Sequence, residues 1–414
     1  MSRSEHGRRR QRRLRRDRRP AGGHAQRRRP PGRAQHRSPR HRRPRADGPR
    51  RPAIVGEGRA CLNGVEADGA ATLAAAGLEP ITLGPRDGLA LVGSNAVSIG
   101  HAALVDRRIE RLARWAHGVV ALTFEGFRAS TAPMSPAAIA ARPAPGEAES
   151  AALINALLDG GQLTDPRNAR RLQDPISLRA VACTHGALLT ALAGLNTALD
   201  AELRGNGDNP LVLDDATVLP TAGFHTPALA LAVDTVALAT AQAAAAATAR
   251  CARLLSPTMT GLPANLTTHG LGRSGFAPVL KTAEALTAEI MHHAHPTVLD
   301  PRPGASEVED DSSNLPLGVR RLDRIAALLP RLLAIEALMA AQAIEFAAPP
   351  SIGVGACRLY DAVRAQVPPL DDDRPLGPEI EQVATAVFTD DDLLVAVIAT
   401  PAAPAPTRPP ASRR

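Results

Sequence analysis

The chain has 414 residues, enough for one large or two ordinary domains, and 44% of them are hydrophobic, which is ample for a buried core. Aromatic residues make up only 2%, so Ala and Leu carry most of the apolar content. Ala and Leu favour helices, whereas strands prefer Val, Ile, Tyr and Phe. The composition therefore predicts an all-α protein and argues against a fold built on a large sheet.

The net charge of +8 conceals a strong asymmetry along the chain. Residues 1–51 hold 21 Arg against three acidic residues, a net charge of +18, so the rest of the chain carries −10. The overall basicity thus gives no reason to expect that the folded part binds nucleic acid. The cysteines have no paired spacing, which predicts neither a disulfide framework nor a metal site and suits a reducing cytoplasm. They are Cys61, Cys183, Cys251 and Cys357.

Residues 1–51 form a low-complexity segment of Arg, Pro, Gly, His and Ala, which cannot bury enough apolar surface to offset its ordering entropy. We expect this segment to be disordered, like the Pro-rich basic tail at 401–414. Dense Arg without any Lys is typical of a GC-rich coding region translated out of frame, and we favour that interpretation. The alternatives are a solvated tail and an arm that binds nucleic acid or another polyanion.

No apolar run reaches the roughly 20 residues that span a bilayer without interruption by charge, Gly or Pro. The Ala-rich stretch at 226–249 contains Asp234 and is predicted to be a buried helix. Residues 1–51 also lack the apolar region of a secretory signal. We therefore expect no association with a membrane.

From Pro52 the composition becomes globular, and residues 52–400 are predicted to form one helical domain. A short connecting region comes first, with turns expected at Asn63-Gly64 and at Pro80 and a small hairpin around the first of them. Residues 101–128 repeat apolar side chains at helical spacing and predict a buried amphipathic helix. Pro and Gly separate the further helices, which we expect at 147–160, 178–203, 225–255, 276–294, 319–346, 355–366 and 376–397.

Three of these predicted helices, at 178–203, 225–255 and 319–346, are longer than most helices of globular proteins. Ala on several faces of each suits close helix packing, so we expect a long multi-helix bundle. Bundles of this kind often carry sites where helix ends converge.

The segment from Gln173 to Arg179 carries the clearest chemical signal. Asp174-Pro175 precedes a long predicted helix, where Asp can act as the N-cap and Arg179 falls within the first turns. A cation near the positive end of a helix is mildly unfavourable, which indicates an anionic partner such as a carboxylate held by the guanidinium fork. A surface ion pair is the alternative interpretation.

Three later segments have ordinary structural interpretations when each is taken alone. Asp208-Asn209-Pro210 is typical of a turn, and Phe224 is typical of a core residue. His225 at a predicted helix start is interpreted as a cap. Glu309 lies in an acidic run that ordinarily forms a solvated loop.

Taken in order, these segments resemble the aromatic amino acid ammonia-lyase family, and its histidine-type members most. The resemblance rests on the order and spacing of several motifs between about Gly56 and about Leu394. It implies the helical bundle of that family, a small amino acid as substrate, a homotetramer with pockets shared between subunits, and the elimination of ammonia. The motifs are Gln173-Asp174-Pro175-Ile176-Ser177-Leu178-Arg179, Gly207-Asp208-Asn209-Pro210-Leu211, Gly223-Phe224-His225 and Glu309-Asp310.

The resemblance also assigns roles to five substrate-binding residues. It implies that Arg179 binds the substrate carboxylate, that Gln173 supports the site, and that Asn209 makes a polar contact beside the prosthetic group. Phe224 matches the residue near the substrate ring, and Glu309 matches a Glu that can pair with an imidazole.

The same comparison shows departures from the family pattern. Members build the electrophile 4-methylidene-imidazol-5-one (MIO) from an internal Ala-Ser-Gly, and this tripeptide occurs nowhere in the chain. The family's loop Tyr has no counterpart, because the only Tyr is Tyr360. Ile176 and Gly93 stand where histidine-type members have Tyr and Asn, and Val308 and Asp311 replace the Gln and His that flank the matched Glu. We therefore assign no catalytic residue and expect no turnover.

Two hypotheses of different class follow from these observations. The first is an N-terminally truncated or frame-disrupted aromatic amino acid ammonia-lyase, and the second is an inactive helical protein with a polyanion-binding basic arm. A third, a lyase of the fumarase and argininosuccinate type, ranks last because residues 310–314 do not form that group's Gly-Ser-Ser loop.

The nucleotide sequence of the locus, translated in all three forward frames, tests the first hypothesis. We expect Ala-Ser-Gly followed by Asp-Leu in another frame just before the Gly56 codon. If no frame contains it, the chain is a genuine variant without the electrophile, and a binding or structural role becomes the better interpretation.

Overall fold

The computed structural model describes residues 51–300 and 309–399. The predicted disorder of the segment 1–51, apart from Arg51, and of the tail 401–414 lies outside these ranges. The described chain divides into two compact units, residues 51–82 and residues 83–399. The predominance of helix confirms the all-α prediction.

The first unit contains the predicted hairpin. A short 3-10 helix, η1 (Arg51–Val55), precedes strands β1 (Arg59–Leu62) and β2 (Val65–Asp68), which pair antiparallel and are followed by α1 (Gly69–Ala75). The turn residues Asn63 and Gly64 both have positive φ, 51° and 81°. Two-residue hairpin turns of this kind require positive φ at both positions, which Asn and Gly tolerate best.

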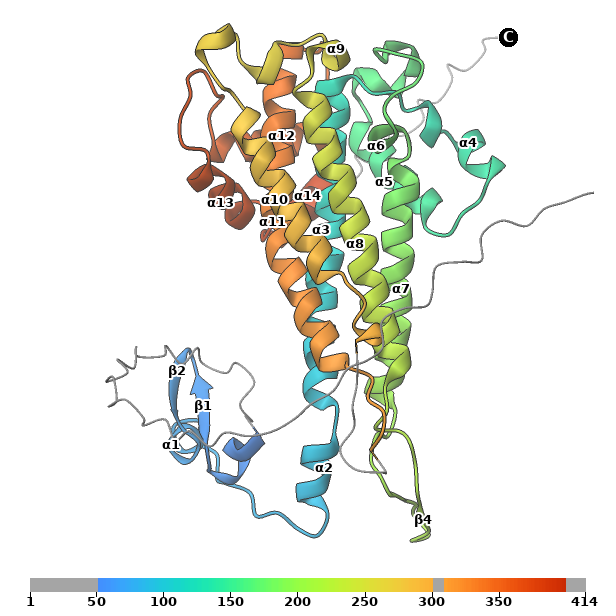
Figure 1. Cartoon of the computed structure of the whole chain (residues 1–414), viewed down its shortest axis with the longest axis vertical. Helices are drawn as coiled ribbons and strands as arrows, with labels where there is room; N and C mark the ends of the chain where they lie inside the picture. Colours follow the sequence, from blue (N-terminus) through green and yellow to red (C-terminus); the bar gives the residue numbers. More distant parts are fainter. Residues whose placement is uncertain (1–50, 301–308, 400–414) are drawn as a thin grey trace, which may run out of the picture. The chain divides into compact units, whose positions relative to one another are not determined.

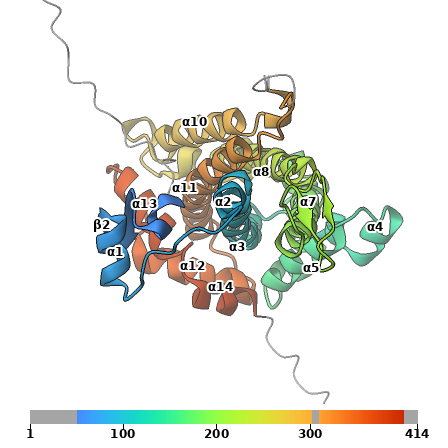
Figure 2. The ribbon, with the colours of Figure 1, turned by 90° about the horizontal axis from the view of Figure 1, so that it is seen from below.

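The second unit is built on five long helices that run side by side (Figure 1). The helix α11 lies at the centre when the bundle is viewed along its axis, and it packs most extensively against α3 and α8 (Figure 2). Most of the side chains of α11 are buried, so this helix forms the middle of the core. The five helices are α3 (Ala96–Phe127), α7 (Val181–Arg204), α8 (Pro227–Leu254), α10 (Ala277–His293) and α11 (Leu315–Ala347).

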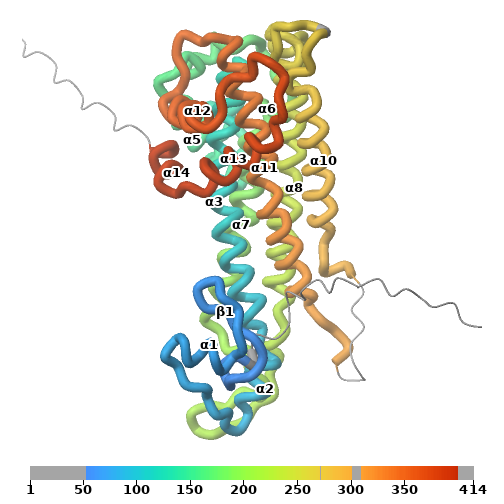
Figure 3. Tube along the Cα trace, turned by 90° about the vertical axis from the view of Figure 1, so that its left-hand side faces the viewer, coloured from blue at the N-terminus to red at the C-terminus, as the bar shows by residue number. Residues whose placement is uncertain are grey.

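Shorter elements occupy the two ends of this bundle (Figures 1 and 3). At one end lie α2 (Asp87–Gly93) and a small ribbon of β3 (Leu211–Val212) and β4 (Val218–Leu219). Towards the other end lie α4 (Pro136–Ala141), α5 (Glu147–Leu158), α6 (Ile176–Arg179), α9 (Pro257–Thr260), α12 (Val354–Gln366), α13 (Gly377–Ala386) and α14 (Asp391–Ile398). Single 3-10 turns occur at η2 (Ala132–Met134), η3 (Gln162–Thr164), η4 (Pro166–Asn168), η5 (Ala264–Leu266), η6 (Gly270–Gly272) and η7 (Thr297–Leu299).

Two helices predicted as continuous are in fact broken. The stretch 178–203 divides at Ala180, whose φ of −100° and ψ of 19° separate α6 from α7. The stretch 376–397 divides between α13 and α14, because the carboxylate of Asp390 accepts a hydrogen bond from the amide of Leu393 at 2.9 Å and starts a new helix. These local caps override a periodic apolar pattern that continues across both breaks.

A buried ion pair joins the central helices. Glu336 on α11 accepts hydrogen bonds from Arg250 on α8, at 2.5 Å from Nε and 3.0 Å from Nη2, and from the hydroxyl of Thr123 on α3 at 2.9 Å. Both charged side chains are at most 1% exposed. The remaining Nη1 of Arg250 donates to the carbonyl of Ser177 on α6 at 3.3 Å. One guanidinium therefore connects the core to the segment that carries Arg179.

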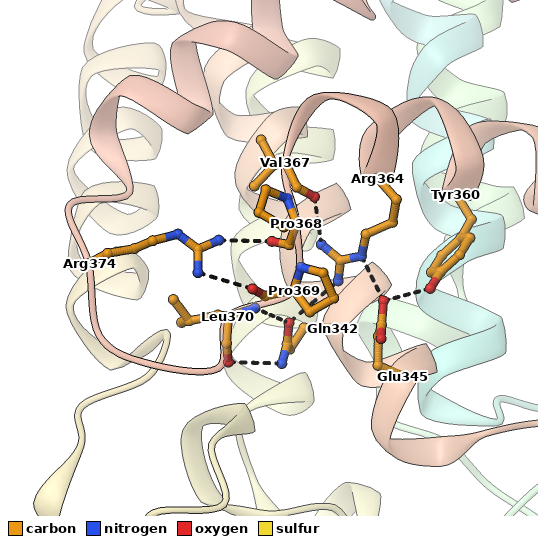
Figure 4. Close-up of polar contacts among 9 residues, drawn as sticks. All are labelled: Gln342, Glu345, Tyr360, Arg364, Val367, Pro368, Pro369, Leu370 and Arg374. Atoms are coloured by element: carbon orange, nitrogen blue, oxygen red, sulfur yellow. Dashed lines mark hydrogen bonds and ion pairs between the residues drawn. The ribbon is translucent and has the colours of Figure 1, made fainter.

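A second polar cluster attaches the C-terminal helices to α11 (Figure 4). Arg364 on α12 donates to Glu345 at 2.8 Å, and Tyr360 donates its hydroxyl to the same carboxylate at 2.6 Å. The amide of Gln342 exchanges two hydrogen bonds with the backbone of Leu370. Arg374 donates to the two preceding proline carbonyls. The loop between α12 and α13 is thus fixed to the end of α11.

Two helices, α8 and α11, are long and apolar enough to cross a bilayer by length and composition alone. Most of the apolar window of α11 is buried within the bundle, and just over half of that of α8. Asp234 on α8 is also buried and accepts hydrogen bonds from the Thr297 hydroxyl and the Val298 amide. Because the buried charged groups Asp234, Arg250 and Glu336 all have partners inside the protein, we interpret α8 and α11 as bundle helices.

The buried ion pair yields a stability prediction. Substitution Glu336→Gln leaves the Arg250 guanidinium buried without a counter-charge, which we expect to lower the free energy of unfolding by about 3–5 kcal/mol. The midpoint of urea unfolding, followed by far-ultraviolet circular dichroism, measures this loss. Glu381→Gln is the matched control, because the Arg331–Glu381 pair also joins α11 to a neighbouring helix but is half exposed, and its loss should cost at most about 1 kcal/mol. Equal midpoints for the two variants would contradict the structural role of the buried pair.

Candidate functional site

A cavity of ≈ 840 Å³ lies at the end of the bundle where α7 stops. Its walls come from α2, the first turn of α3, the last turn of α7 and the loops that follow α7 and precede α8. Three of the five predicted substrate-binding residues, Asn209, Phe224 and Glu309, line it together. The sequence separation between these three residues reaches 100 positions, so the fold brings them to one place.

The loop that carries Asn209 is internally hydrogen-bonded. The side-chain oxygen of Asn209 accepts a hydrogen bond from the backbone amide of Thr221 at 2.9 Å. Its own backbone amide donates to the carboxylate of Asp208 at 3.0 Å, and the peptide bond to Pro210 is cis. Within residues 51–300 and 309–399 the side-chain amide nitrogen of Asn209 has no hydrogen-bond partner. Asn209 therefore offers a donor to whatever occupies the cavity.

Phe224 and Glu309 lie on the solvent side of the same cavity. The Phe224 side chain is about half exposed, and its backbone carbonyl accepts a hydrogen bond from the side-chain amide of Asn95. Glu309 is exposed at the first described position after residue 308. His225 does not occupy the cap position of α8, which belongs to Thr226, and its ring instead lies 3.5 Å from the carboxylate of Asp311.

One lining residue, Glu202, was not predicted from the sequence. It lies in the last turn of α7, is half buried, and faces the cavity that Asn209 also lines. Burial raises the pKa of its carboxyl above the ordinary value, because no neighbouring cation in the described chain offsets the loss of solvent. The sequence did offer one signal for Glu202. This residue lies about one turn before the Gly207–Leu211 motif, at the end of the helix predicted at 178–203.

The other two predicted residues, Gln173 and Arg179, contact each other at a different location. The guanidinium of Arg179, at the end of α6, donates to the side-chain oxygen of Gln173 at 2.8 Å. The prediction that Asp174 caps a helix is wrong, because Pro175 holds the N-cap position. The carboxylate of Asp174 is buried and instead accepts a hydrogen bond from the amide of Ser130 at 2.6 Å. Burial raises the pKa of this carboxyl, and the Ser130 hydrogen bond opposes that shift.

The pair of Gln173 and Arg179 and the cavity with Asn209 lie at opposite ends of α7. Arg179 precedes the first residue of this helix, and Asn209 follows its last residue. The helix has 24 residues, which at a rise of 1.5 Å per residue separates its ends by about 36 Å. A single amino acid substrate cannot bridge that distance, so one chain does not bring all five predicted residues into one site.

Comparison with known proteins identifies the family of the chain. A family model described as aromatic amino acid lyase matches residues 52–365. The chain is 36% identical over 354 residues to a histidine ammonia-lyase from Symbiobacterium thermophilum, which covers 85% of this chain and 69% of that protein. It is also 36% identical over 357 residues to a histidine ammonia-lyase from Bradyrhizobium diazoefficiens, with the same coverage of each protein.

Solved structures show the same fold. The ergothioneine-degrading ergothionase from Treponema denticola matches with a TM-score of 0.77 and 27% identity, over 84% of this chain and 69% of that one. Histidine ammonia-lyase from Trypanosoma cruzi matches with a TM-score of 0.76 and 28% identity, over 84% and 67%. The fold and the family model together define an all-α lyase of the ammonia-lyase class. The chain belongs to the aromatic amino acid lyase family.

Members of this family generally use MIO. No Ala-Ser-Gly occurs in the 414 residues. The only tyrosine, Tyr360, is bonded to Glu345 beside α12 and lies in the cluster that fixes the C-terminal helices (Figure 4). Neither the electrophile nor a tyrosine base is therefore assigned here.

Proposed function

We propose that this chain is the helical body of a histidine-type ammonia-lyase, whose substrate site forms between copies of the chain. The observation that carries the proposal is the split of the predicted residues into two groups at the two ends of α7. The relatives named as histidine ammonia-lyases support the substrate class, an aromatic L-amino acid such as histidine.

Each group has the chemistry for one part of such a substrate. Arg179, already held by Gln173 at 2.8 Å, offers further donors that can bind a carboxylate in bidentate geometry. At the other end, Glu309 supplies a negative charge that can pair with an imidazole, and Phe224 supplies an exposed ring for apolar contact. Asn209 supplies a neutral donor next to both.

The reaction of the intact relatives would break the Cβ–H and C–N bonds of the substrate and release ammonia and an unsaturated acid, urocanate in the case of histidine. This chain has no precursor of the family's electrophile. We therefore propose that it binds an aromatic acid without eliminating ammonia. An increase of urocanate absorbance from L-histidine and purified protein would overturn this part of the proposal.

Binding of urocanate, measured by isothermal titration calorimetry, tests the site itself. Substitution Arg179→Met removes a charge-assisted contact to the carboxylate, which is worth about 1.5–3 kcal/mol and should weaken binding by about 10- to 100-fold. Arg167→Met is the matched control. Arg167 also lies at the end of the bundle that carries Arg179, but it is exposed and paired with Asp165. Equal losses in both variants, or no binding by the folded wild-type chain, would contradict the proposal.

We also propose that the copies assemble as a homotetramer in the cytoplasm. A groove of ≈ 980 Å³ between α7 and α8 supports an apolar partner surface, since Ala, Gly and Thr form most of its lining. Leu231 and Leu238 on α8 remain about half exposed and are spaced seven residues apart, on one face of the helix. A second copy that covers this face would bury them.

Mixing two defective variants tests whether sites are shared. Arg179→Met and Asn209→Asp should each lose urocanate binding when pure. If Arg179 of one copy meets Asn209 of another, co-refolded mixtures should recover about a quarter of the binding capacity, because that fraction of sites receives both native residues at random. Recovery near zero would contradict shared sites.

Light scattering on the same samples gives the number of copies, and a monomeric wild-type chain would contradict the assembly.

A further inference from the structure

The helix α2 is anchored at both ends to the loops that carry predicted site residues. Arg86, immediately before α2, donates from a single nitrogen, Nη2, to the carboxylate of Asp208 and to the carbonyl of Pro210, both at 2.6 Å. Asn95, just after α2, donates to the backbone carbonyl of Phe224. These contacts join segments that are more than 120 residues apart in the chain.

The two acceptors of Arg86 flank Asn209 directly in the sequence. Arg86 thus binds the side chain of the residue before Asn209 and the backbone carbonyl of the residue after it. Thr221 fixes the rest of the loop, because its hydroxyl donates to the Asp208 carbonyl at 2.7 Å and its amide donates to the Asn209 side chain at 2.9 Å. Because its oxygen already accepts from Thr221, the NH₂ group is the part of the Asn209 side chain left to bind an occupant of the cavity that Asn209 lines.

We propose that Arg86 is a positioning residue, which holds Asn209 so that its NH₂ group faces the occupant of the cavity. This inference rests on the proposed function for the identity of the occupant, an aromatic acid with acceptor oxygens. Arg86 is not among the residues that line the cavity. Arg86 acts through the loop that carries Asn209. A displacement of this loop by about 1 Å can remove much of the contribution that Asn209 makes to binding.

A purely stabilising role is the competing explanation, and the exposure of the pair argues against it. The side chains of Arg86 and Asp208 are 41% and 34% exposed. Ion pairs of this exposure contribute at most about 1 kcal/mol to stability. The main effect of the Arg86 contacts is therefore to fix the geometry of the loop from Asp208 to Pro210.

The test compares three full-length variants. Arg86→Met removes the donor, whereas Arg86→Lys retains it, because one ammonium can serve both acceptors as the single Nη2 does. Arg204→Met is the matched control, since Arg204 forms a similar pair with Asp200 at 2.6 Å in the last turn of α7 and contacts neither loop. All three are measured by hydrogen–deuterium exchange of residues 206–221 and by the affinity for urocanate.

We expect Arg86→Met to speed exchange in residues 206–221 by about tenfold, without changing exchange in α8 or α11 or the unfolding midpoint. Its affinity for urocanate should fall by about tenfold, while Arg86→Lys stays within about threefold of wild type and Arg204→Met is unchanged. Unchanged exchange in Arg86→Met would overturn the positioning role. So would faster exchange throughout the bundle, which indicates a general loss of stability.

The two readouts separate this inference from the proposed function. If residues 206–221 loosen as expected but wild-type protein binds no urocanate, the positioning of Asn209 is supported and the proposed function is overturned. If wild-type protein binds urocanate and Arg86→Met binds it equally well, the proposed function stands and the positioning role is overturned.

Discussion

The structure depends on the buried pair of Arg250 and Glu336. Two charges that are at most 1% exposed carry a large desolvation cost, which only a full set of hydrogen bonds offsets. Glu336 meets this condition with Arg250 and Thr123, and Arg250 extends the network to the carbonyl of Ser177. Since Ser177 lies two residues before Arg179, the same pair that joins α3, α8 and α11 also sets where α6 and its guanidinium lie.

The length of α7 then determines how a site can form. Because α7 has 24 residues, Gln173 and Arg179 at one of its ends and the cavity residues at the other lie about 36 Å apart within one chain. The apolar groove beside α7 and the half-exposed leucines of α8 provide a surface on which another copy can lie. The proposed function combines these two features: the two groups of residues lie apart within one chain, and the uncovered face of α8 is where a second copy would lie.

The features that could be predicted from the sequence are those encoded locally. Ala and Leu content predicted the helical class, and Asn63-Gly64 predicted the hairpin. Apolar periodicity predicted α3, and the Pro and Gly breaks predicted the other four long helices, all to within about five positions. Two errors were local, because the breaks at Ala180 and Asp390 interrupt helices predicted as continuous. Another arose where a distant partner decides the outcome, since Asp174 binds the amide of Ser130, 44 residues away. No local pattern distinguishes an Asp that caps the next helix from one that binds a remote loop. Glu202 was missed for a related reason, because its burial exists only once α2 and the loop after α7 form the cavity.

The departures from the family pattern follow the same division into two ends. Ile176, which the family resemblance matches to a Tyr, lies on α6 with Arg179 and is largely exposed. Gly93, which it matches to an Asn, lies in the wall of the cavity with Asn209. Each substitution removes a neutral hydrogen-bonding group from one part of the proposed site and leaves the charged group of that part, Arg179 or Glu309, in place. Hydrogen bonds to charged groups contribute about 1.5–3 kcal/mol and neutral ones about 1 kcal/mol. On the proposed function, recognition of an aromatic acid would therefore rest mainly on the charges of Arg179 and Glu309. Asn209, held by its loop, would be the neutral donor in the cavity that Glu309 also lines.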